Sequence, residues 1–542
     1  MRFLNLDIKN TFFNVFNSKR KLHTMRGNLM LRRQGMQDKA TRINEQISSQ
    51  KIDLKLDTIP IMNMDISDIE IAYKQFLLIN FGGYALSAMI LRNIGSKDWR
   101  SRIYPVPRSW RIIIQQNQIE VNNLLSDIFW QLRLFLNGCL NSYKILKIFF
   151  STSELSKKIK SSNYSVFFSV SELNVSSEKG ILNEYSVYSD IARIEGFQSN
   201  QILIGDGKSL NLEYKNYYGN KVVFTKSFWA SFLTFREKVE LIPTFLKLIL
   251  LSISYSATRN LTNFLFIKEI FIAHIVMRLN DKLIGKNFYF NNGAYIYRPL
   301  WTYFVETPQK QISMYFYSSN IQQFSYLKSK YPNRMHFGYS TMNWPRYLAW
   351  DECQADFLKK INKNKQINIS GPIEYGGIEL PKKPFKSKTL AIFDVTPVRK
   401  STYDSLAVEF DYYTYENAKK FVEDIVKIAT KMDYDIIYKS KRPASSITHK
   451  GYKNFIKNLA KTNMNFFVVE PNVAASSIIK SSELVISMPF TSTALLGLKY
   501  LKKSIFYDAT CLLEERETAS SNVIYLRGIA ELEKYFQEIK NN

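Results

Sequence analysis

The sequence predicts an α/β protein with two Rossmann-like domains and a basic, partly helical N-terminal region. The chain has 542 residues, which is enough for two or three domains with substantial cores. Hydrophobic residues make up 46% of it, which excludes a disordered chain. Apolar runs of strand length alternate with amphipathic helical segments, most clearly in the last third. Such alternation is typical of parallel sheets with crossover helices.

The last third of the chain shows this alternation most regularly. Between residues 415 and 432, Ala418, Phe421, Val422 and Ile425 recur at the spacing of one helix face. Predicted strands cover 388–395, 435–438, 465–469, 484–487, 504–507 and 523–526, and predicted helices cover 415–432, 452–460, 473–480, 494–501 and 529–539.

The region upstream shows the pattern less clearly. Glycines and prolines stand among lysines over 373–388, which predicts a linker between a first domain, 1–372, and a second domain, 389–542. The longest apolar stretch, 241–253, is too short to span a bilayer, and we expect a buried helix there. Predicted strands cover 301–306, 312–317, 347–350 and 367–370, with a helix over 353–361, weaker strands at 164–170 and 201–204, a mainly helical segment over 210–290, and no fold assigned to 1–110.

A hydroxyl-rich turn, Pro489–Ala494, lies between the strand predicted over 484–487 and the helix that follows. Free backbone N–H groups and hydroxyls would collect at the start of that helix, at the carboxyl end of a parallel strand. Ligands bind at this end of open α/β sheets, and a helix N-terminus suits an anion such as phosphate. The simpler alternative is an N-cap that only satisfies the first amides of the helix.

The turn also carries a family resemblance. Met488–Ala494, with Gly497 and Tyr507-Asp508, resembles the signature of the bacterial polysaccharide biosynthesis proteins named for a Pro-Phe-Thr-Ser motif. The resemblance implies a GT-B-like, metal-independent glycosyltransferase, with a looser match over 290–542. It further implies that the turn holds the phosphate of a nucleotide-activated donor, which assigns donor phosphate binding to Thr491, Ser492 and Thr493.

A basic segment follows the second strand of this domain. Lys439, Lys441 and Arg442 would face the same crevice as the turn and would suit a phosphate or diphosphate. The related sialyltransferases have a His-Pro pair at the comparable place, whereas this chain has Arg442-Pro443. The type of nucleotide therefore stays open, with a CMP-linked sugar as one possibility. The alternative is an exposed basic turn.

Three further residues are predicted to contact the nucleotide. Glu470 follows the third strand and could accept hydrogen bonds from a ribose or base, although a helix cap is an equal alternative. Asp394 ends the first strand of the second domain and would line the cleft between the domains. Gly371 closes the first domain and would let the backbone approach the donor.

An inverting sugar transfer also needs a general base, which we expect from the first domain. The candidates are Glu184, Asp190 and His336, because they lie among aromatic, turn-like sequence; a structural role is the alternative for each. Asp433 and Asp435 have the spacing of a metal-binding motif, but they precede their strand and are read as a turn. No metal site and no cofactor besides the nucleotide-sugar substrate are expected.

Charge and cysteine content bear on partners and location. The formal net charge of +27 favours polyanionic partners, and the expected ones are a nucleotide-sugar donor, a glycan or lipid-linked acceptor and the anionic inner face of the cytoplasmic membrane. A lysine-rich solvated surface is the alternative. Three cysteines without metal-ligand spacing, and an N-terminus without a clean apolar core, predict a cytoplasmic location.

Two other functions stay open at this point. One is the transfer of glycerol phosphate or a similar unit from a CDP donor. The other is a basic protein without enzymatic activity that binds nucleic acid or anionic lipid. The aromatic residues occur in apolar patterns and form no basic stacking platform, so nucleic acid is not expected as a partner.

Overall fold

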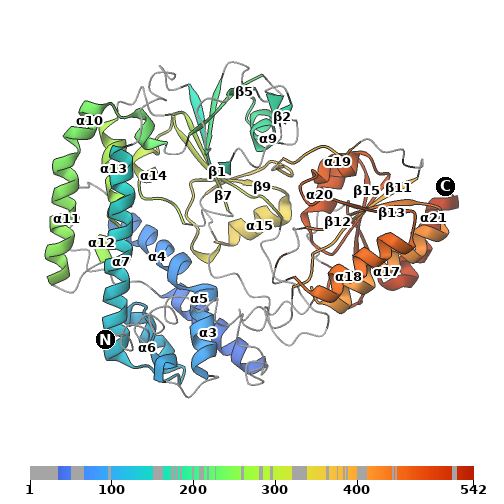
Figure 1. Ribbon diagram of the computed structural model, residues 1–542, viewed down its shortest axis with the longest axis horizontal. Coiled ribbons are helices and arrows are strands. Elements are labelled where there is room, and N and C mark those ends of the chain that lie inside the picture. Colours follow the sequence, from blue (N-terminus) through green and yellow to red (C-terminus); the bar gives the residue numbers. More distant parts are fainter. Residues whose placement is uncertain are drawn as a thin grey trace.

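The computed structural model describes most of the chain beyond residue 33. The described residues are 34–50, 66–94, 99–150, 163–171, 177–178, 181–182, 186–197, 201–206, 213–215, 219–225, 228–257, 262–279, 285–292, 297–319, 327, 339–361, 365–374, 376–381, 385, 388–398, 412–441, 445, 448–515 and 522–541. They form two α/β units that lie side by side, each built on its own sheet (Figure 1).

The N-terminal unit contains a ten-stranded sheet in the order β10-β9-β8-β7-β1-β4-β6-β5-β3-β2. Its pairs are parallel except β2 with β3 and β5 with β6. The strands are β1 (Tyr164–Ser171), β2 (Ser177–Glu178), β3 (Ile181–Leu182), β4 (Ile202–Asp206), β5 (Glu213–Lys215), β6 (Lys221–Thr225), β7 (Asn287–Asn291), β8 (Gln311–Tyr315), β9 (Arg346–Ala349) and β10 (Gln366–Ile369).

Helices cover both faces of this sheet. Successive side chains of β1 alternate between the two faces, so that Phe168 joins the larger core and Phe167 the smaller one, which packs on α9. The helices are α3 (Gln34–Ser49), α4 (Ile66–Phe81), α5 (Gly83–Ile94), η2 (Trp99–Arg102), α6 (Arg108–Gln116), α7 (Asn123–Phe149), α9 (Val187–Ile194), η4 (Trp229–Phe232), α10 (Phe235–Glu240), α11 (Ile242–Ala257), α12 (Thr262–Leu265), α13 (Ile267–Arg278), α14 (Thr302–Val305), η5 (Tyr339–Thr341) and α15 (Glu352–Ile361).

The C-terminal unit is a parallel sheet of six strands in the order β13-β12-β11-β14-β15-β16. In chain order this is 3-2-1-4-5-6, the order of a Rossmann fold. Its elements are β11 (Thr389–Phe393), α17 (Tyr415–Lys431), β12 (Asp435–Lys439), α18 (Lys450–Thr462), β13 (Phe466–Val469), α19 (Ala475–Lys480), β14 (Leu484–Ser487), α20 (Ser492–Lys499), β15 (Lys503–Asp508), β16 (Ile524–Arg527) and α21 (Gly528–Asn541).

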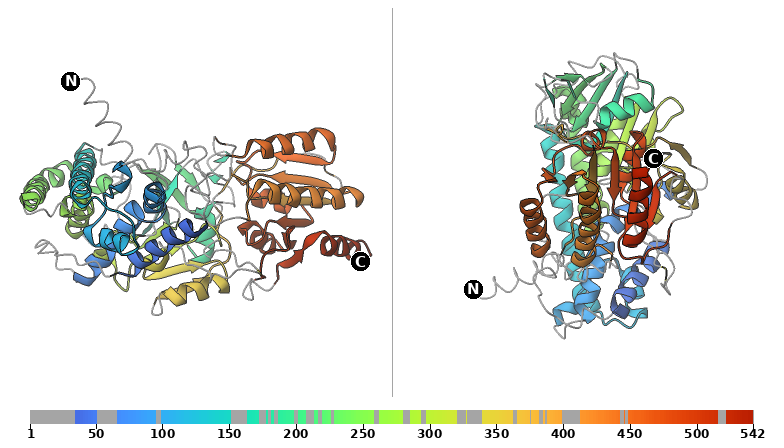
Figure 2. Two further views of the ribbon diagram at one scale, coloured as in Figure 1. Left: turned by 90° about the horizontal axis from the view of Figure 1, so that it is seen from below. Right: turned by 90° about the vertical axis from the view of Figure 1, so that its right-hand side faces the viewer.

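The helices of the C-terminal unit form two layers around its sheet. Leu390 and Ile392 of β11 pack with α17, α18 and α21, whereas Ala391 and Phe393 pack with α19 and α20. Figures 1 and 2 show α19 and α20 on the side of this sheet that faces the N-terminal unit. The predicted α/β fold with two Rossmann-like domains is confirmed.

Two details of the N-terminal unit differ from the expectation. Residues 301–306, predicted as a strand, contain the short helix α14, because Thr302 and Tyr303 bond back to Pro299 and Leu300. The segment 210–290 contains the strands β5, β6 and β7 besides its helices. The exact domain limits, 1–372 and 389–542, stay a prediction.

The apolar stretch 241–253 forms a helix as predicted, but this helix is not buried all round. Leu246 and Leu250 of α11 are 52% and 66% exposed, whereas Phe245 and Leu248 are buried. Within the described residues no single helix is long and apolar enough to cross a membrane, and one bent pair, Asp68–Phe81 with Ala85–Ile94, meets that test only when both helices are taken together.

Candidate donor site

The hydroxyl-rich turn lies at the topological switch point of the C-terminal sheet. The central strands β11 and β14 are parallel neighbours, and Phe393 is paired with Ser487 at their carboxyl ends. From β11 the chain leads to strands on one side of the sheet, and from β14 to strands on the other. In open α/β sheets, a crevice for ligands forms where the direction of winding reverses.

Backbone and side-chain bonds hold the turn open at this edge. The Met488 amide donates to the Phe393 carbonyl (3.1 Å), and the Thr491 amide donates to the Met488 carbonyl (3.3 Å). Phe490 has a φ of 59°, which turns the chain sharply between strand and helix. Its ring is buried and stacks on Tyr525 at a centroid distance of 5.8 Å, which offsets the cost of this conformation.

The hydroxyls of the turn do not act as a simple N-cap. Thr491 is the N-cap residue of α20, yet its side chain makes no capping bond, and its hydroxyl donates to the Met488 carbonyl instead (2.8 Å). The Thr493 hydroxyl lies 2.8 Å from that of Ser487 on β14. The first amides of α20 therefore keep the positive end of the helix dipole directed at the sheet edge.

Ser492 places the turn against the N-terminal unit. The amide of Ser319, which follows β8, donates to the Ser492 hydroxyl at 3.2 Å. Thr491 is buried, whereas Ser492 and Thr493 are half-buried. The turn thus faces the boundary between the two units.

Asp394 ends β11 beside this turn, but its carboxylate is enclosed by tyrosines. One of its oxygens accepts hydrogen bonds from the Tyr438 and Tyr452 hydroxyls, both at 2.7 Å, and the residue is 3% exposed. Burial raises the pKa of Asp394, while the bonds from the two tyrosines lower it in part. Through this oxygen Asp394 holds β11, β12 and α18 together, and its contact with the nucleotide stays a prediction.

The basic segment after β12 lies at the same edge of the sheet. Lys439 is paired with Phe393 across the β11–β12 ladder, and burial lowers its pKa while Asp394 raises it. Lys441 is exposed. Arg442 lies outside the described residues. Lys439 and Lys441 therefore stand one strand away from the β11–β14 switch point.

The other two predicted nucleotide contacts follow strands at the edges of the two sheets. Glu470 is exposed and follows β13, which forms one edge of the C-terminal sheet, two strands from β11. Gly371 follows β10, at an edge of the N-terminal sheet; its φ of 72° favours glycine, and the space where a Cβ would stand is open. Asp433 has a φ of 59° and stands in the turn before β12, as expected.

Among the three candidates for the general base, only Asp190 lies within the described residues; Glu184 and His336 do not. Asp190, on α9, is 4% exposed and bound by cations. Its two carboxylate oxygens lie 2.8 and 3.0 Å from the Lys499 Nζ, and Arg193 donates to it at 3.2 Å. The backbone amide of Glu374 also donates to Asp190, at 2.8 Å.

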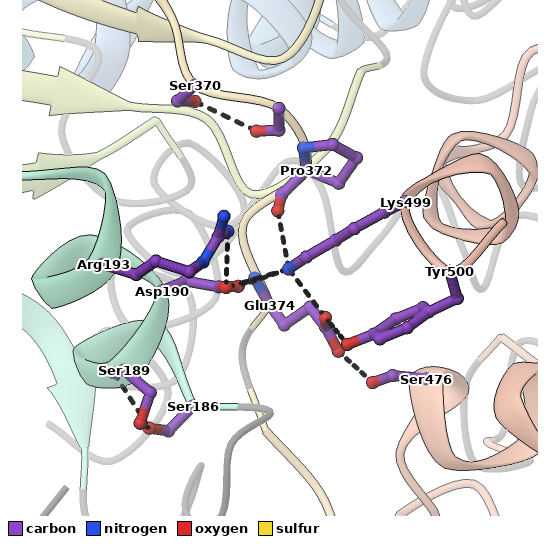
Figure 3. Close-up of polar contacts among 11 residues, drawn as sticks. Ser186, Ser189, Asp190, Arg193, Ser370, Pro372, Glu374, Ser476, Lys499 and Tyr500 are labelled. Atoms are coloured by element: carbon purple, nitrogen blue, oxygen red, sulfur yellow. Dashed lines mark hydrogen bonds and ion pairs between the residues drawn. The ribbon is translucent and has the colours of Figure 1, made fainter. Parts of the chain in front are cut away.

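Lys499 thereby joins three parts of the chain, as Figure 3 shows. It ends α20, the helix that begins at the hydroxyl turn. Besides Asp190, its ammonium contacts Glu374 (2.9 Å) and the Pro372 carbonyl (3.1 Å). The same Glu374 accepts bonds from Tyr500 and Ser476. Sequence reasoning missed Lys499 and Glu374, because no local pattern relates residues that are 125 positions apart.

A comparison with protein families identifies the family of this chain. Residues 244–536, more than half of the chain, match the family described as Polysaccharide biosynthesis PFTS motif protein. The chain belongs to this family. The matched region includes the Pro-Phe-Thr-Ser turn at residues 489–492 and the whole of the C-terminal sheet. No curated protein is similar to the chain at a significant level.

Solved structures similar to this PFTS protein are distant in sequence. The wall teichoic acid polymerase TagF is 10% identical, with 76% of this chain and 89% of that one covered and a TM-score of 0.37. A putative UDP-N-acetylglucosamine 2-epimerase from Listeria monocytogenes is 11% identical, with 70% and 88% covered and a TM-score of 0.35. The calicheamicin glycosyltransferase CalG4 is 9% identical, with 69% and 89% covered and a TM-score of 0.29.

Proposed function

We propose that this PFTS protein is a glycosyltransferase that transfers a sugar from a nucleotide-activated donor to a glycan or lipid-linked acceptor in polysaccharide biosynthesis. One observation carries the proposal. The family's hydroxyl turn lies at the switch point of a 3-2-1-4-5-6 sheet, starts a helix without capping it, and faces the other domain. A phosphate bound there would meet amide dipoles and hydroxyls aimed at one place.

In this proposal the turn stabilises the leaving nucleotide. As the bond from sugar to phosphate breaks, negative charge grows on the phosphate oxygens, and preorganised donors lower the energy of that charge. Ser492 and Thr493 would donate from the turn, and Lys439 and Lys441 would offset the charge from the neighbouring strand. In other transferases a metal ion supplies the positive charge that stabilises the leaving phosphate. Here we propose that these side chains supply it and that transfer is metal-independent.

The acceptor side of the reaction would come from the N-terminal domain. A base there takes the proton from the attacking hydroxyl. We assign Asp190 to domain positioning, since Lys499 and Arg193 already bind its carboxylate. Glu184 and His336 stay candidates for the base. A cytoplasmic location, where nucleotide-sugars are available, belongs to the same proposal.

The donor site is tested with the double variant Ser492→Ala, Thr493→Ala. We expect nucleotide affinity to fall at least about tenfold, because two hydroxyl donors to a charged phosphate are lost. Binding is measured by calorimetry with CMP, CDP, UDP and GDP. The matched control is Thr462→Ala with Ser481→Ala, two exposed hydroxyls at the opposite, amino-terminal edge of the same sheet.

The outcomes separate the proposal from its rivals. A folded double variant that keeps the affinity of the wild-type protein would refute the site. Preference for CDP, with turnover of a CDP-linked glycerol unit and none of a sugar, would replace sugar transfer by glycerophosphate transfer. Failure of all four nucleotides to bind the wild-type protein would contradict the proposed enzyme altogether.

A further inference from the structure

A cavity of about 260 Å³ lies among the helices of the N-terminal domain, between α4, α7 and α13. Three cations line it: Arg133 and Lys144 from α7, and Lys268 from α13. The carboxylate in its wall is Glu269, which is 7% exposed and accepts a bond from the Leu300 amide at 3.3 Å. With three cations and one carboxylate, the cavity carries positive charge in a partly enclosed space.

Arg133 is held in place for a ligand of the opposite charge. Its guanidinium lies over the Phe81 ring at 4.3 Å, and its Nη1 donates to the Pro105 carbonyl at 3.3 Å. Burial lowers the pKa of Arg133 to about 10, so the group is still charged at neutral pH. A half-buried arginine in this position gains from a bound anion, because the anion replaces part of the lost hydration.

The outer face of α7 is apolar along its whole length. The helix has 27 residues, which corresponds to about 40 Å. Its exposed apolar residues recur at spacings of three and four, which places most of them along one face: Leu124, Ile128, Leu132, Phe135, Leu140, Tyr143 and Leu146, with Phe150 directly after the helix. A single exposed leucine is ordinary, whereas a contiguous apolar row of this length marks an interaction surface.

The cavity and the apolar row lie on opposite sides of α7, because the cavity-lining Arg133, Asn137, Asn141 and Lys144 follow a three- and four-residue spacing of their own. Lys144 lines the cavity and is exposed, and it stands one turn from Leu140, which is 58% exposed. Lys147 lies over the Tyr143 ring at 4.9 Å, on the next turn. Cations and apolar side chains therefore alternate at the flank of α7, as they do on helices that lie in the interface of an anionic bilayer.

A second exposed apolar row lies on the neighbouring helices. Phe235 and Val239 of α10, with Ile242, Leu246 and Leu250 of α11, continue at spacings of three and four, and all five are exposed. Both views that show this end of the molecule place α11 beside α7, remote from the C-terminal domain (Figures 1 and 2). The donor turn and this apolar end are thus on different parts of the protein.

We propose that the α7 end of the N-terminal domain docks on an anionic phospholipid bilayer, with the apolar faces of α7 and α11 in the interface and Lys144 and Lys147, at the flank of α7, against the lipid phosphates. A phospholipid bilayer is the occupant because it offers both required chemistries, anionic head groups for the lysines and an apolar layer for the exposed rows. The net charge of +27 adds long-range attraction to such a surface.

The test is flotation of the full chain with vesicles of equal parts phosphatidylglycerol and phosphatidylcholine, compared with vesicles of phosphatidylcholine alone. The wild-type protein should bind the anionic vesicles more tightly. Lys144→Gln with Lys147→Gln should lower that affinity about twenty-fivefold, since each cation near an anionic surface contributes about a fivefold factor. Leu140→Ser with Leu146→Ser should lower binding to a similar degree.

Matched controls lie on the C-terminal domain. Lys427→Gln with Lys457→Gln removes two exposed cations, and Met464→Ser with Leu501→Ser removes two side chains that are 92% and 95% exposed. Neither control should change vesicle binding by more than about twofold, since these residues lie away from the α7 end. Nucleotide affinity should be unchanged in both α7 variants, which separates this proposal from the donor site.

Three results would overturn the proposal. Equal binding of the wild-type protein to both vesicle types would exclude anionic lipid as the partner. Unchanged vesicle binding in the folded variant Lys144→Gln, Lys147→Gln would exclude these lysines from the membrane contact. A dimer in solution that Leu140→Ser with Leu146→Ser converts to monomer would assign the apolar face to a second copy of the chain.

Discussion

The two domains use the same parallel strand pairing but reach it in different ways. In the C-terminal domain, strands that follow one another in the chain pair through one crossover, except at the switch point between β11 and β14. In the N-terminal domain, β1 pairs with β7, and the register partners Ser165 and Asn287 are 122 positions apart in the chain. The first kind of sheet is assembled from local units, whereas the second depends on long-range contacts that close large loops.

The two domains also differ in the surface that each leaves for a partner. The C-terminal domain collects hydroxyls, amides and lysines at one sheet edge, which suits a small phosphorylated ligand. The N-terminal domain exposes apolar rows flanked by lysines, which suits an extended amphiphilic surface. The difference implies that substitutions should affect one binding activity or the other, and seldom both.

The largest effect is expected where the two domains meet. Lys499→Met leaves the carboxylates of Asp190 and Glu374, each with 5% side-chain exposure, without their shared cation. Removing one partner of a buried ionic cluster typically costs about 3–5 kcal/mol, and we expect the free energy of unfolding to fall by that amount. Denaturant unfolding measures it, with Lys503→Met, at an exposed residue, as the control. An unchanged unfolding midpoint would show that the cluster does not stabilise the protein.

Two glycines, one in each domain, test whether the two binding surfaces are independent. A Cβ on Gly138 of α7 would lie 2.2 Å from the Phe264 ring, and a Cβ on Gly497 of α20 would lie 2.0 Å from the Ser504 hydroxyl. Each Gly→Ala change should lower the free energy of unfolding by about 1–3 kcal/mol through overpacking. Gly138→Ala should weaken vesicle binding alone, and Gly497→Ala should weaken nucleotide binding alone.

The test with the two glycines has a control, and one outcome would contradict it. Ser504→Gly should restore part of the stability and of the nucleotide affinity lost in Gly497→Ala, because it removes the clashing hydroxyl. If both glycine variants weaken the same binding activity, the two surfaces are not independent and the comparison fails.

The smallest effect concerns acid stability of the N-terminal domain. Burial, together with the positive charges of Arg278 and Lys247, lowers the pKa of His274 on α13 to about 4. Because the unfolded state binds this proton near pH 6.5 and the folded state does not, stability is lost as pH falls from about 6.5 to 4. His274→Gln should remove about 1–2 kcal/mol of that loss, after allowance for partial exposure. Denaturant unfolding at several pH values measures this effect. A difference in the free energy of unfolding between variant and wild type that stays constant with pH would contradict the assignment to His274.

The C-terminal sheet could be predicted from the sequence because each of its elements is encoded locally. All six predicted strands overlap observed ones, and the turn at residues 489–494 lies at the carboxyl end of β14 as expected. Buried parallel strands are short continuous apolar runs, and the helices between them show one apolar face, so the two kinds of segment are easily distinguished.

The N-terminal sheet could be predicted only in part. The run 301–306 is aromatic and short, and periodicity alone cannot distinguish a strand from one helical turn in such a segment. Strand β7 lies in a segment expected to be mainly helical, and it belongs to the sheet because β1 and β8 lie on either side of it. Pairing partners that distant cannot be read from local pattern.

The candidate site shows the same limit. The position of Thr491, Ser492 and Thr493 followed from one local motif. The position of Asp190 did not, because its partner Lys499 is 309 residues away in the chain. The sequence also did not reveal that tyrosines from β12 and α18 enclose Asp394, because a residue at the end of a strand can face either a ligand or the core.

Helix α20 has a mechanical consequence. The N–H of Ser319 holds its first residue, and Asp190 holds its last, so both ends of this eight-residue helix are tied to the opposite domain. These two ties alone would leave one axis of rotation, along the helix; a third, from the Leu327 amide to the Leu512 carbonyl at 3.0 Å, lies away from α20 and would have to break first. Opening of the two lobes would then pivot about α20, and whatever anion sits at its first turn would lie on that pivot, where it moves least.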